Sequence, residues 1–272
     1  MISAASLIGT HDVLLMTLDT LRYDVAVDAL DAGMTPNLAR LLPGGEWEQR
    51  HSPGNFTYAA HQAFFAGFLP TPVQPGRHPR LFAARFPGSE TTTEATYVFD
   101  APDIVTGLSE QGYYTICIGG VGFFNRLSPL GSVLPSLFAE SHWSPELGVT
   151  DPASTRNQID RALKAIDGVD DNQRIFLFIN VSALHQPNCY YLEGATEDSP
   201  QSQAAALAYV DSCLPPLLTR LRSRGPLLGI ICSDHGTAYG EEGYWGHRIC
   251  HPVVWNVPYA EFVLSRENEV AS

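Results

Sequence analysis

Four short runs of apolar residues recur along the chain, and each run is continuous rather than alternating with polar residues. Continuous runs of this kind are typical of parallel strands whose two faces are both covered. Between them, segments carry apolar residues at spacings of three and four, as helices with one buried face do. This alternation predicts an α/β fold, a three-layer α/β/α arrangement around a mostly parallel central sheet. The predicted strands span residues 13–18, 114–119, 174–180 and 227–232.

The helical segments carry recognisable start and stop signals. Thr35 and Pro36 suit the N-cap and the first turn of one helix. A further short helix is predicted to begin with Thr57 as its N-cap and to end at Gly67. No repeat or linker interrupts the chain, which predicts a single domain over residues 1–272. The helix that begins at Pro36 is predicted to span residues 36–42, and the remaining predicted helices span residues 102–112, 153–166 and 201–224.

The composition excludes several classes of protein. The 272 residues include 29 acidic and 16 basic side chains, a formal net charge of −13, which argues against binding to nucleic acid or to anionic membranes. The cysteines number five and lack C-x-x-C spacing, so free thiols in a reducing compartment are expected. No basic segment precedes the first apolar run, and no stretch of about 18 apolar residues occurs, so neither a secretory signal nor a transmembrane helix is expected. The expected location is the cytoplasm.

Polar side chains gather where the predicted strands end. Asp19 follows the first strand, and Asp234 and His235 follow the fourth. In an open α/β sheet, the carboxyl ends of the strands form the ligand site. Each residue alone has an ordinary explanation as a turn residue, a helix cap or a hydrogen-bonded histidine. Two carboxylates at one edge repel each other unless a cation lies between them, and an imidazole is a ready third ligand, so the set predicts a divalent metal site.

Thr57 has two interpretations. In the first, it is only a helix cap, and His61 is an ordinary residue near the first turn. In the second, its hydroxyl lies at a helix N-terminus, where free N–H groups and the helix dipole favour a phosphate or another oxyanion. A metal ion that contacts this oxygen would turn a poor nucleophile into a usable one. Composition alone favours the first interpretation.

Five segments, in the right order, resemble motifs of the alkaline phosphatase and sulfatase superfamily. The likeness spans residues 12–264 and is closest to a group of bacterial sulfatase-like hydrolases. It implies an alkaline phosphatase-like fold without the C-terminal subdomain of the large sulfatases. The segments are LLMTLDTLRYD with the metal-binding aspartate, TPNLARLL, SPGNFTYAAHQAFFAG as the nucleophile helix, FLFINVSALHQPN with a His-x-Pro turn, and SDHGTAYGEEGYWGH as the second metal motif.

The resemblance implies a metal site with four ligands. Asp19, Asp234 and His235 would bind the ion together with the oxygen of Thr57, which would be the nucleophile. This mixed oxygen and nitrogen ligand set suits Zn²⁺ or Mn²⁺ and leaves Mg²⁺ and Ca²⁺ open. Sulfatases have a second aspartate directly after the first, whereas Thr20 follows Asp19 here. A second site of the phosphatase type adds an aspartate and two histidines, and only His185, His247 and His251 are candidates here. One ion is therefore expected, with a second ion left open.

Further residues receive catalytic or binding roles. His185 and His247 would contact the bound oxyanion, donate a proton to the leaving group or help to ligate a second ion. His61 takes the position of the arginine that usually supports the nucleophile, and His251 has no counterpart in the family. The candidate substrate-binding residues are Arg22, Asn55 and Asn125.

Two segments are predicted as long loops over the strand ends, where they would line the pocket for the organic part of the substrate. Residues 70–87 are rich in proline, arginine and phenylalanine, and residues 122–145 mix aromatic residues with glycine and proline. Their arginines are weaker candidates for anion contacts: Arg77, Arg80 and Arg126.

The nucleophile decides the predicted chemistry. Sulfatases oxidise a cysteine or serine to formylglycine, a route closed to Thr57 because its β-carbon already bears a methyl group. The sequence therefore predicts a metal-dependent phosphodiesterase or phosphatase, a hydrolase or transferase that acts on small-molecule phosphoesters or phosphonate esters through a covalent phosphothreonine. Two alternatives stay open, a sulfuric ester hydrolase with an unusual nucleophile and a noncatalytic metal-binding protein of the same fold. The oligomeric state is not predicted.

Overall fold

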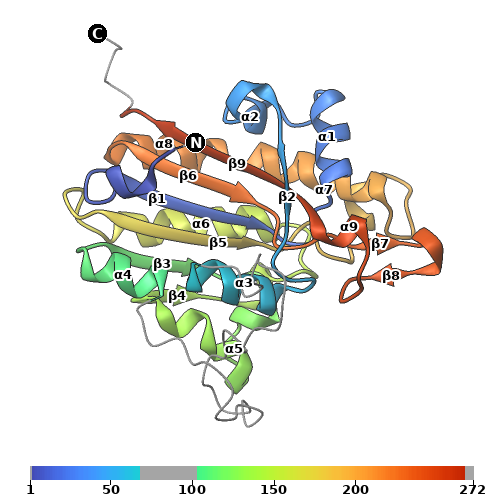
Figure 1. Ribbon diagram of the computed structural model, residues 1–272, viewed down its shortest axis with the longest axis horizontal. Helices are drawn as coiled ribbons and strands as arrows, with labels where there is room; N and C mark the ends of the chain where they lie inside the picture. Colours follow the sequence, from blue (N-terminus) through green and yellow to red (C-terminus); the bar gives the residue numbers. More distant parts are fainter. Residues whose placement is uncertain (1, 68–102, 267–272) are drawn as a thin grey trace, which may run out of the picture.

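The computed structural model describes residues 2–67 and 103–266 and confirms the predicted α/β fold (Figure 1). Within these residues, seven strands form one mixed sheet in the order β2-β9-β6-β1-β5-β3-β4. The strands from β6 to β4 pair in parallel, whereas β9 pairs antiparallel with both β6 and β2. The strands are β1 (Asp12–Leu18), β2 (Glu48–His51), β3 (Tyr114–Ile118), β4 (Glu140–His142), β5 (Ile175–Val181), β6 (Leu227–Cys232) and β9 (Asn256–Leu264), and a separate hairpin joins β7 (Ala238–Tyr239) and β8 (Trp245–Gly246).

The four predicted strands are the centre of this sheet, where β6, β1, β5 and β3 lie side by side. All seven residues of β5 are buried, as expected for a strand covered on both faces. In the sheet register, Thr17 of β1 lies beside Asn180 of β5 and Cys232 of β6. The carboxyl ends of these three strands therefore meet at one edge of the sheet.

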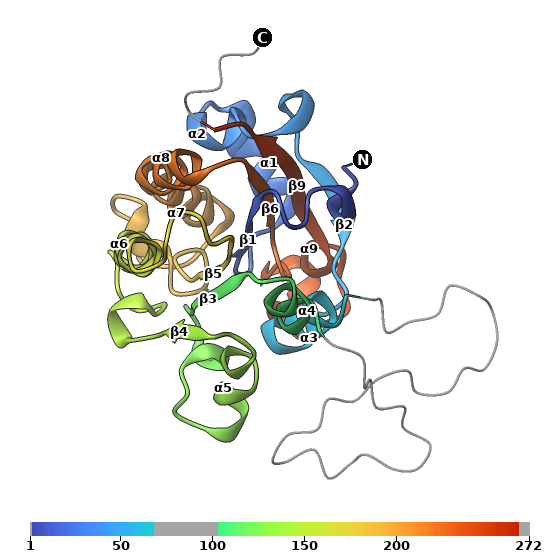
Figure 2. The same cartoon turned by 90° about the vertical axis from the view of Figure 1, so that its left-hand side faces the viewer.

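Helices cover both faces of the sheet and complete three layers (Figure 2). One apolar core packs side chains of α1, α6, α7 and α8 against the sheet, and a second core packs α3 and α4 against the opposite face. The helices are α1 (Tyr23–Asp31), α2 (Pro36–Ala39), α3 (Thr57–Ala66), α4 (Ile104–Glu110), α5 (Pro129–Val133), α6 (Ser154–Asp167), α7 (Pro200–Cys213), α8 (Pro215–Arg224) and α9 (Pro252–Trp255). Short 3₁₀ turns are η1 (Ala4–Ser6), η2 (Pro43–Gly45), η3 (Gly122–Phe124), η4 (Pro135–Leu137), η5 (Pro145–Leu147), η6 (Cys189–Tyr191) and η7 (Glu241–Gly243).

Two sequence predictions about these elements are wrong in detail. The segment 201–224 forms two helices rather than one, because α7 ends at Cys213 and α8 begins at Pro215, whose nitrogen has no hydrogen to donate. The segment 122–145 is not one long loop, since it contains η3, α5, η4 and β4. The other predicted loop, 70–87, lies outside the described residues and includes Arg77 and Arg80.

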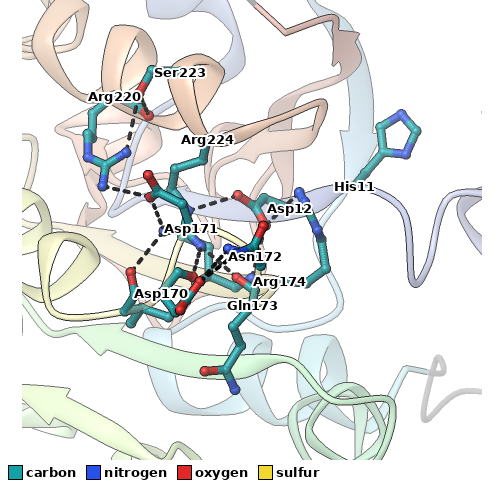
Figure 3. Close-up of polar contacts among 12 residues, drawn as sticks. His11, Asp12, Asp170, Asp171, Asn172, Gln173, Arg174, Arg220, Ser223 and Arg224 are labelled. Atoms are coloured by element: carbon teal, nitrogen blue, oxygen red, sulfur yellow. Dashed lines mark hydrogen bonds and ion pairs between the residues drawn. The ribbon is translucent and has the colours of Figure 1, made fainter.

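The amino-terminal edge of the sheet is fastened by a buried ion pair (Figure 3). Arg224, at the end of α8, is 2% exposed and donates from Nε to Asp12 Oδ2 at 3.1 Å. Its other nitrogens donate to Asp171 and to the carbonyl of Gln173. Asp12 Oδ1 in turn accepts the backbone N–H of Ile175. The network therefore ties α8 to the first residues of β1 and β5, at the edge opposite the polar cluster.

The five cysteines form no disulfide, as predicted. Among residues 2–67 and 103–266, no helix combines the length and apolar character needed to cross a membrane.

Candidate metal and nucleophile site

Three buried side chains converge at the carboxyl edge of the sheet, as the sequence predicts. Asp19 directly follows β1, and Asp234 and His235 come two and three residues after the neighbouring strand β6. All three side chains are 0% exposed. Each offers one ligand atom, and these atoms all lie within 4.8 Å of one another. Asp19, Asp234 and His235 therefore form a candidate metal site.

The two carboxylates have the unpartnered oxygens that a cation site requires. Asp19 Oδ1 and Asp234 Oδ2 are buried and have no hydrogen-bond partner. Burial and the neighbouring Asp234 raise the pKa of Asp19 to about 6, and burial raises the pKa of Asp234 to about 7. Burying carboxylate oxygens without partners is costly, and a divalent cation between them would remove that cost. These residues therefore fit a metal ion.

His235 is in the form that binds metals. Its Nδ1 lies 2.9 Å from the carbonyl oxygen of Gly236, which makes Nδ1 the protonated nitrogen and leaves a lone pair on Nε2. Burial lowers the pKa of His235, which favours the neutral ring. Nε2 lies 3.6 Å from Asp234 Oδ2. Ligands at bond lengths of about 2.1 Å in tetrahedral geometry lie roughly 3.4 Å apart, so this spacing suits ligands of one ion.

Thr57 reaches this cluster from the first turn of α3. Its hydroxyl donates toward Asp19 Oδ2 at 3.4 Å and lies 3.3 Å from His235 Nε2. The prediction that Thr57 is the N-cap is wrong, because the extended residue Phe56 occupies that position and Thr57 is the first helical residue. The Thr57 hydroxyl is therefore not used to cap the helix, and no side chain caps this end of α3. A helix end of this kind can bind an oxyanion.

His61 lies one turn along α3 and is 0% exposed. Its Nδ1 lies 2.7 Å from the carbonyl oxygen of Thr57, and its Nε2 lies 3.0 Å from Thr17 Oγ1. The ring packs against Phe124 and Phe178, and burial lowers its pKa to about 3, so it is neutral. A neutral, enclosed ring does not replace the charge of an arginine. His61 instead holds the backbone of Thr57 in position.

A cavity of about 500 Å³ opens beside Thr57. Thr57, His185, His247 and Arg248 all line it. The ring centroid of His247 lies 4.7 Å from that of His235 and 5.6 Å from that of His185. Burial and the neighbouring His235 lower the pKa of His247 to about 3, which keeps the ring neutral. The two predicted histidines thus lie between the cavity and the candidate metal ligand His235.

The predicted substrate-binding residues have other contacts. The Arg22 guanidinium forms ion pairs with Asp24 and Glu241. The Oδ1 atom of Asn125 accepts the backbone N–H of Leu127 at 2.8 Å. Neither residue is among the described residues that line the cavity. Both side chains therefore make contacts within the protein.

The remaining candidates are not among the described residues that line the cavity. The Asn55 carbonyl accepts the backbone N–H of Arg248 at 2.8 Å and thereby ties that residue to the start of α3. His251 caps α9, where its Nδ1 accepts the backbone N–H of Val253. Arg126 donates to the carbonyl of Pro135 at 3.1 Å.

Two residues with no predicted role contribute to the site. Asn180, the next-to-last residue of β5, donates from Nδ2 to Asp19 Oδ2 at 3.1 Å and so fixes this carboxylate. Its sequence signal is a polar residue near the end of a buried strand. Arg248 lines the cavity with a backbone φ of 68°, in the left-handed region that glycine prefers. Its sequence signal is only its position next to His247.

No protein-family model matches the sequence, and no curated protein matches it. Solved structures do match. The C-terminal periplasmic domain of the phosphoethanolamine transferase EptC from Campylobacter jejuni is 14% identical with a TM-score of 0.60, over 93% of this chain and 80% of that one. A protein of the alkaline phosphatase superfamily from Vibrio parahaemolyticus is 17% identical with a TM-score of 0.56, over 95% of this chain and 61% of that one. The PsFucS1 sulfatase from Pseudoalteromonas sp. is also 17% identical with a TM-score of 0.56, over 95% and 63%.

At these identities the likeness concerns the fold. The chain has an alkaline phosphatase-like fold, which confirms at this level the resemblance inferred from the sequence motifs. The matching domain of EptC is periplasmic, so the comparisons do not support the predicted cytoplasmic location.

Proposed function

We propose that this chain is a metal-dependent enzyme that hydrolyses or transfers phosphoester or phosphonate-ester groups through a covalent bond to Thr57. One observation carries the proposal: the Thr57 hydroxyl lies 3.4 Å from Asp19 Oδ2 and 3.3 Å from His235 Nε2, at the wall of a cavity. The name of one structural neighbour, a phosphoethanolamine transferase, supports phosphoryl chemistry on this fold.

The metal would be held by Asp19, Asp234 and His235, and its charge would lower the pKa of the Thr57 hydroxyl. Zn²⁺ or Mn²⁺ suits this ligand set best. The side chain of Asn180 keeps Asp19 Oδ2 in position, and His61 holds the backbone carbonyl of Thr57. Both contacts fix Thr57 relative to the proposed metal ligands before substrate binds.

The groups around the cavity would handle the phosphoryl group. The uncapped start of α3 and the Arg248 guanidinium offer positive potential to the nonbridging oxygens. Thr57 Oγ1 would give its proton to solvent water in the cavity as it forms the bond to phosphorus, and the bond from phosphorus to the alcohol oxygen would break with its electron pair leaving on that oxygen. His185, which lines the cavity together with Thr57, is the candidate that protonates this oxygen. Water or an acceptor alcohol then releases the group from Thr57.

Thr57→Ala tests the proposal. We expect loss of at least about a thousandfold in kcat for bis-p-nitrophenyl phosphate, because the variant has no nucleophile. The metal content, measured by elemental analysis, should stay close to that of the original protein, since three ligands remain. Thr219→Ala on the exposed side of α8 is the matched control and should keep full activity. Unchanged turnover in Thr57→Ala would remove Thr57 from the mechanism.

A further inference from the structure

The cavity beside Thr57 has two chemically different parts. The polar part contains Thr57, His185, His247 and Arg248, and the opposite wall carries two polar side chains, Ser128 and Thr150. The remaining wall is mostly apolar and is built by η3, α5 and the segment around β4. Its large apolar residues are Val121, Phe123, Leu130, Trp143 and Val149.

The apolar wall is fixed close to the nucleophile. The ring of Phe123 lies with its centroid 6.3 Å from that of Phe56 and 5.6 Å from that of Tyr58, the two residues that flank Thr57. Trp143 donates from its indole nitrogen to the carbonyl of Gly120 at 3.0 Å, so its polar atom is satisfied and its ring is held. A group attached to a phosphoryl centre at Thr57 therefore meets apolar side chains.

The formal charge on the described lining of this cavity is positive. Arg248 is the one formally charged residue among the described lining residues, and none of them is acidic. This is notable in a chain with 29 acidic and 16 basic residues. Asp19 and Asp234 lie outside the lining, and the proposed metal ion would neutralise them. An ammonium group would lose its hydration in this cavity without gaining a carboxylate partner.

From this wall and this charge distribution, we propose that the organic part of the substrate is uncharged and predominantly apolar, an aryl or alkyl group rather than a cationic amino alcohol. The inference rests on the proposed function and names the substrate class for that site. The apolar wall would bury the organic group, and Arg248 would attract the phosphoryl oxygens and repel a second positive charge.

Three phosphonates that carry the same anionic head and one organic group each test the inference by binding alone. They are phenylphosphonate, propylphosphonate and 2-aminoethylphosphonate, titrated into the metal-loaded protein by calorimetry. We expect phenylphosphonate to bind at least about tenfold more tightly than 2-aminoethylphosphonate, with propylphosphonate between them. Equal binding, or tighter binding of the aminoethyl compound, would overturn the inference.

A matched pair of variants tests whether the preference for phenylphosphonate arises from the apolar wall of the cavity. Leu130 lines the cavity near the start of α5 and is 36% exposed, whereas Leu127 lies outside the lining and is 76% exposed. Leu130→Asp should reduce the phenyl-to-aminoethyl ratio at least fivefold, and Leu127→Asp should leave it unchanged. Thermal melting of both variants checks that they fold. Leu130→Asp is expected to fold, because an aspartate in the first turn of α5 interacts favourably with the helix dipole. A ratio that Leu130→Asp does not change would show that the organic group lies elsewhere, against the inference.

The outcomes also separate this inference from the proposed function. If none of the three phosphonates binds, the site does not hold a phosphoryl group, and the proposed function fails together with the inference. If all three bind without preference for the apolar group, the proposed function stands and the inference fails.

Discussion

Asp19 and Asp234 each have one oxygen fixed by the protein and one oxygen free. Asp234 Oδ1 accepts the backbone N–H groups of Thr20 and His235, while its Oδ2 has no partner. Asp19 Oδ2 accepts from Asn180 and Thr57, while its Oδ1 has no partner. The fixed oxygens orient the two carboxylates, and the free oxygens give them ligand capacity. The orientation does not depend on the cation, because it comes from hydrogen bonds within the protein.

This arrangement makes the stability of the metal-free protein depend on Asp234 and on pH. The folded pKa of Asp234 is raised from 3.8 to about 7 by burial. A raised pKa gives a stabilising contribution that is present below pH 4 and is lost as the pH rises through 7. The asparagine of Asp234→Asn does not titrate, so the free energy of unfolding of this variant does not contain this pH-dependent decrease. Relative to the original protein, the variant should therefore become more stable as the pH rises from 4 to 8, by a few kcal/mol.

Urea denaturation in the presence of EDTA measures the difference at each pH. The buried histidines, whose lowered pKa values act in the opposite direction, are common to both proteins and cancel in this difference. With Zn²⁺ or Mn²⁺ in place of EDTA the order should reverse, because the metal stabilises only a protein that binds it, and Asp234→Asn has lost a ligand. A stability difference that is independent of both pH and metal would contradict the assignment of Asp234 as a ligand.

At the scale of elements, α3 and the turn before it position Thr57. A β-carbon at Gly54, just before the helix, would come within 2.5 Å of the Ala60 nitrogen, so the chain can approach the first turn this closely only with glycine there. Gly67 ends the helix with a φ of 74°. His61 fixes the same first turn from within the core. The position of Thr57 therefore depends on the whole helix and on the tight turn before it.

The element that fastens the opposite edge of the sheet is α8, through Arg224. Arg224→Met should lower the free energy of unfolding by about 3 kcal/mol or more, because it leaves Asp12 buried with fewer partners. The kcat/KM for a phosphodiester should stay unchanged in the folded variant, since the network lies at the edge of the sheet opposite Thr57. Urea denaturation and steady-state kinetics measure the two quantities.

Arg222→Met serves as the control because Arg222 lies on the same helix with an exposed hydrogen bond to Ser265. Its effect on stability should be below about 1 kcal/mol. If the two variants lose equal stability, the buried network does not fasten the sheet.

The sequence predicted the strands that are buried on both faces and the site residues that closely follow them. The four central strands are covered on both faces and therefore read as continuous apolar runs. Three strands of the sheet escaped prediction: β2 is exposed throughout, β4 has only three residues, and β9 carries Pro258 and Glu261 among its apolar residues. The two-residue strands of the β7–β8 hairpin were not predicted either. Asp19 and Asp234 could be predicted because adjacent parallel strands deliver their carboxyl ends to one edge.

Other parts of the site depend on contacts that chain order does not reveal. Arg22 is paired with Glu241, which lies 219 residues further along the chain. Thr57 is the first helical residue rather than the cap, and its hydroxyl faces Asp19 and His235. Arg248 enters the cavity wall through a left-handed backbone that an arginine rarely adopts. None of these features has a signature in local composition.

At the scale of the whole molecule, the sheet separates two tasks. Its amino-terminal edge carries the Arg224 network, and its carboxyl edge carries the candidate metal ligands, Thr57 and the cavity. The chain is strongly acidic, with a net charge of −13, yet the lining of the cavity, within the described residues, has Arg248 as its charged group. The local potential at the site thus opposes that of the molecule and favours an anionic ester there.

The central claim is that Thr57 becomes covalently bound to phosphorus during turnover, and mass spectrometry of the acid-quenched reaction tests it most directly. Metal-loaded protein is mixed with bis-p-nitrophenyl phosphate, quenched within the first turnover and digested. The account predicts one substrate-derived phosphoryl group, located on Thr57 by fragmentation and absent in Thr57→Ala. A phosphoryl group on a different residue, or a stoichiometric first release of p-nitrophenol by Thr57→Ala, would contradict it.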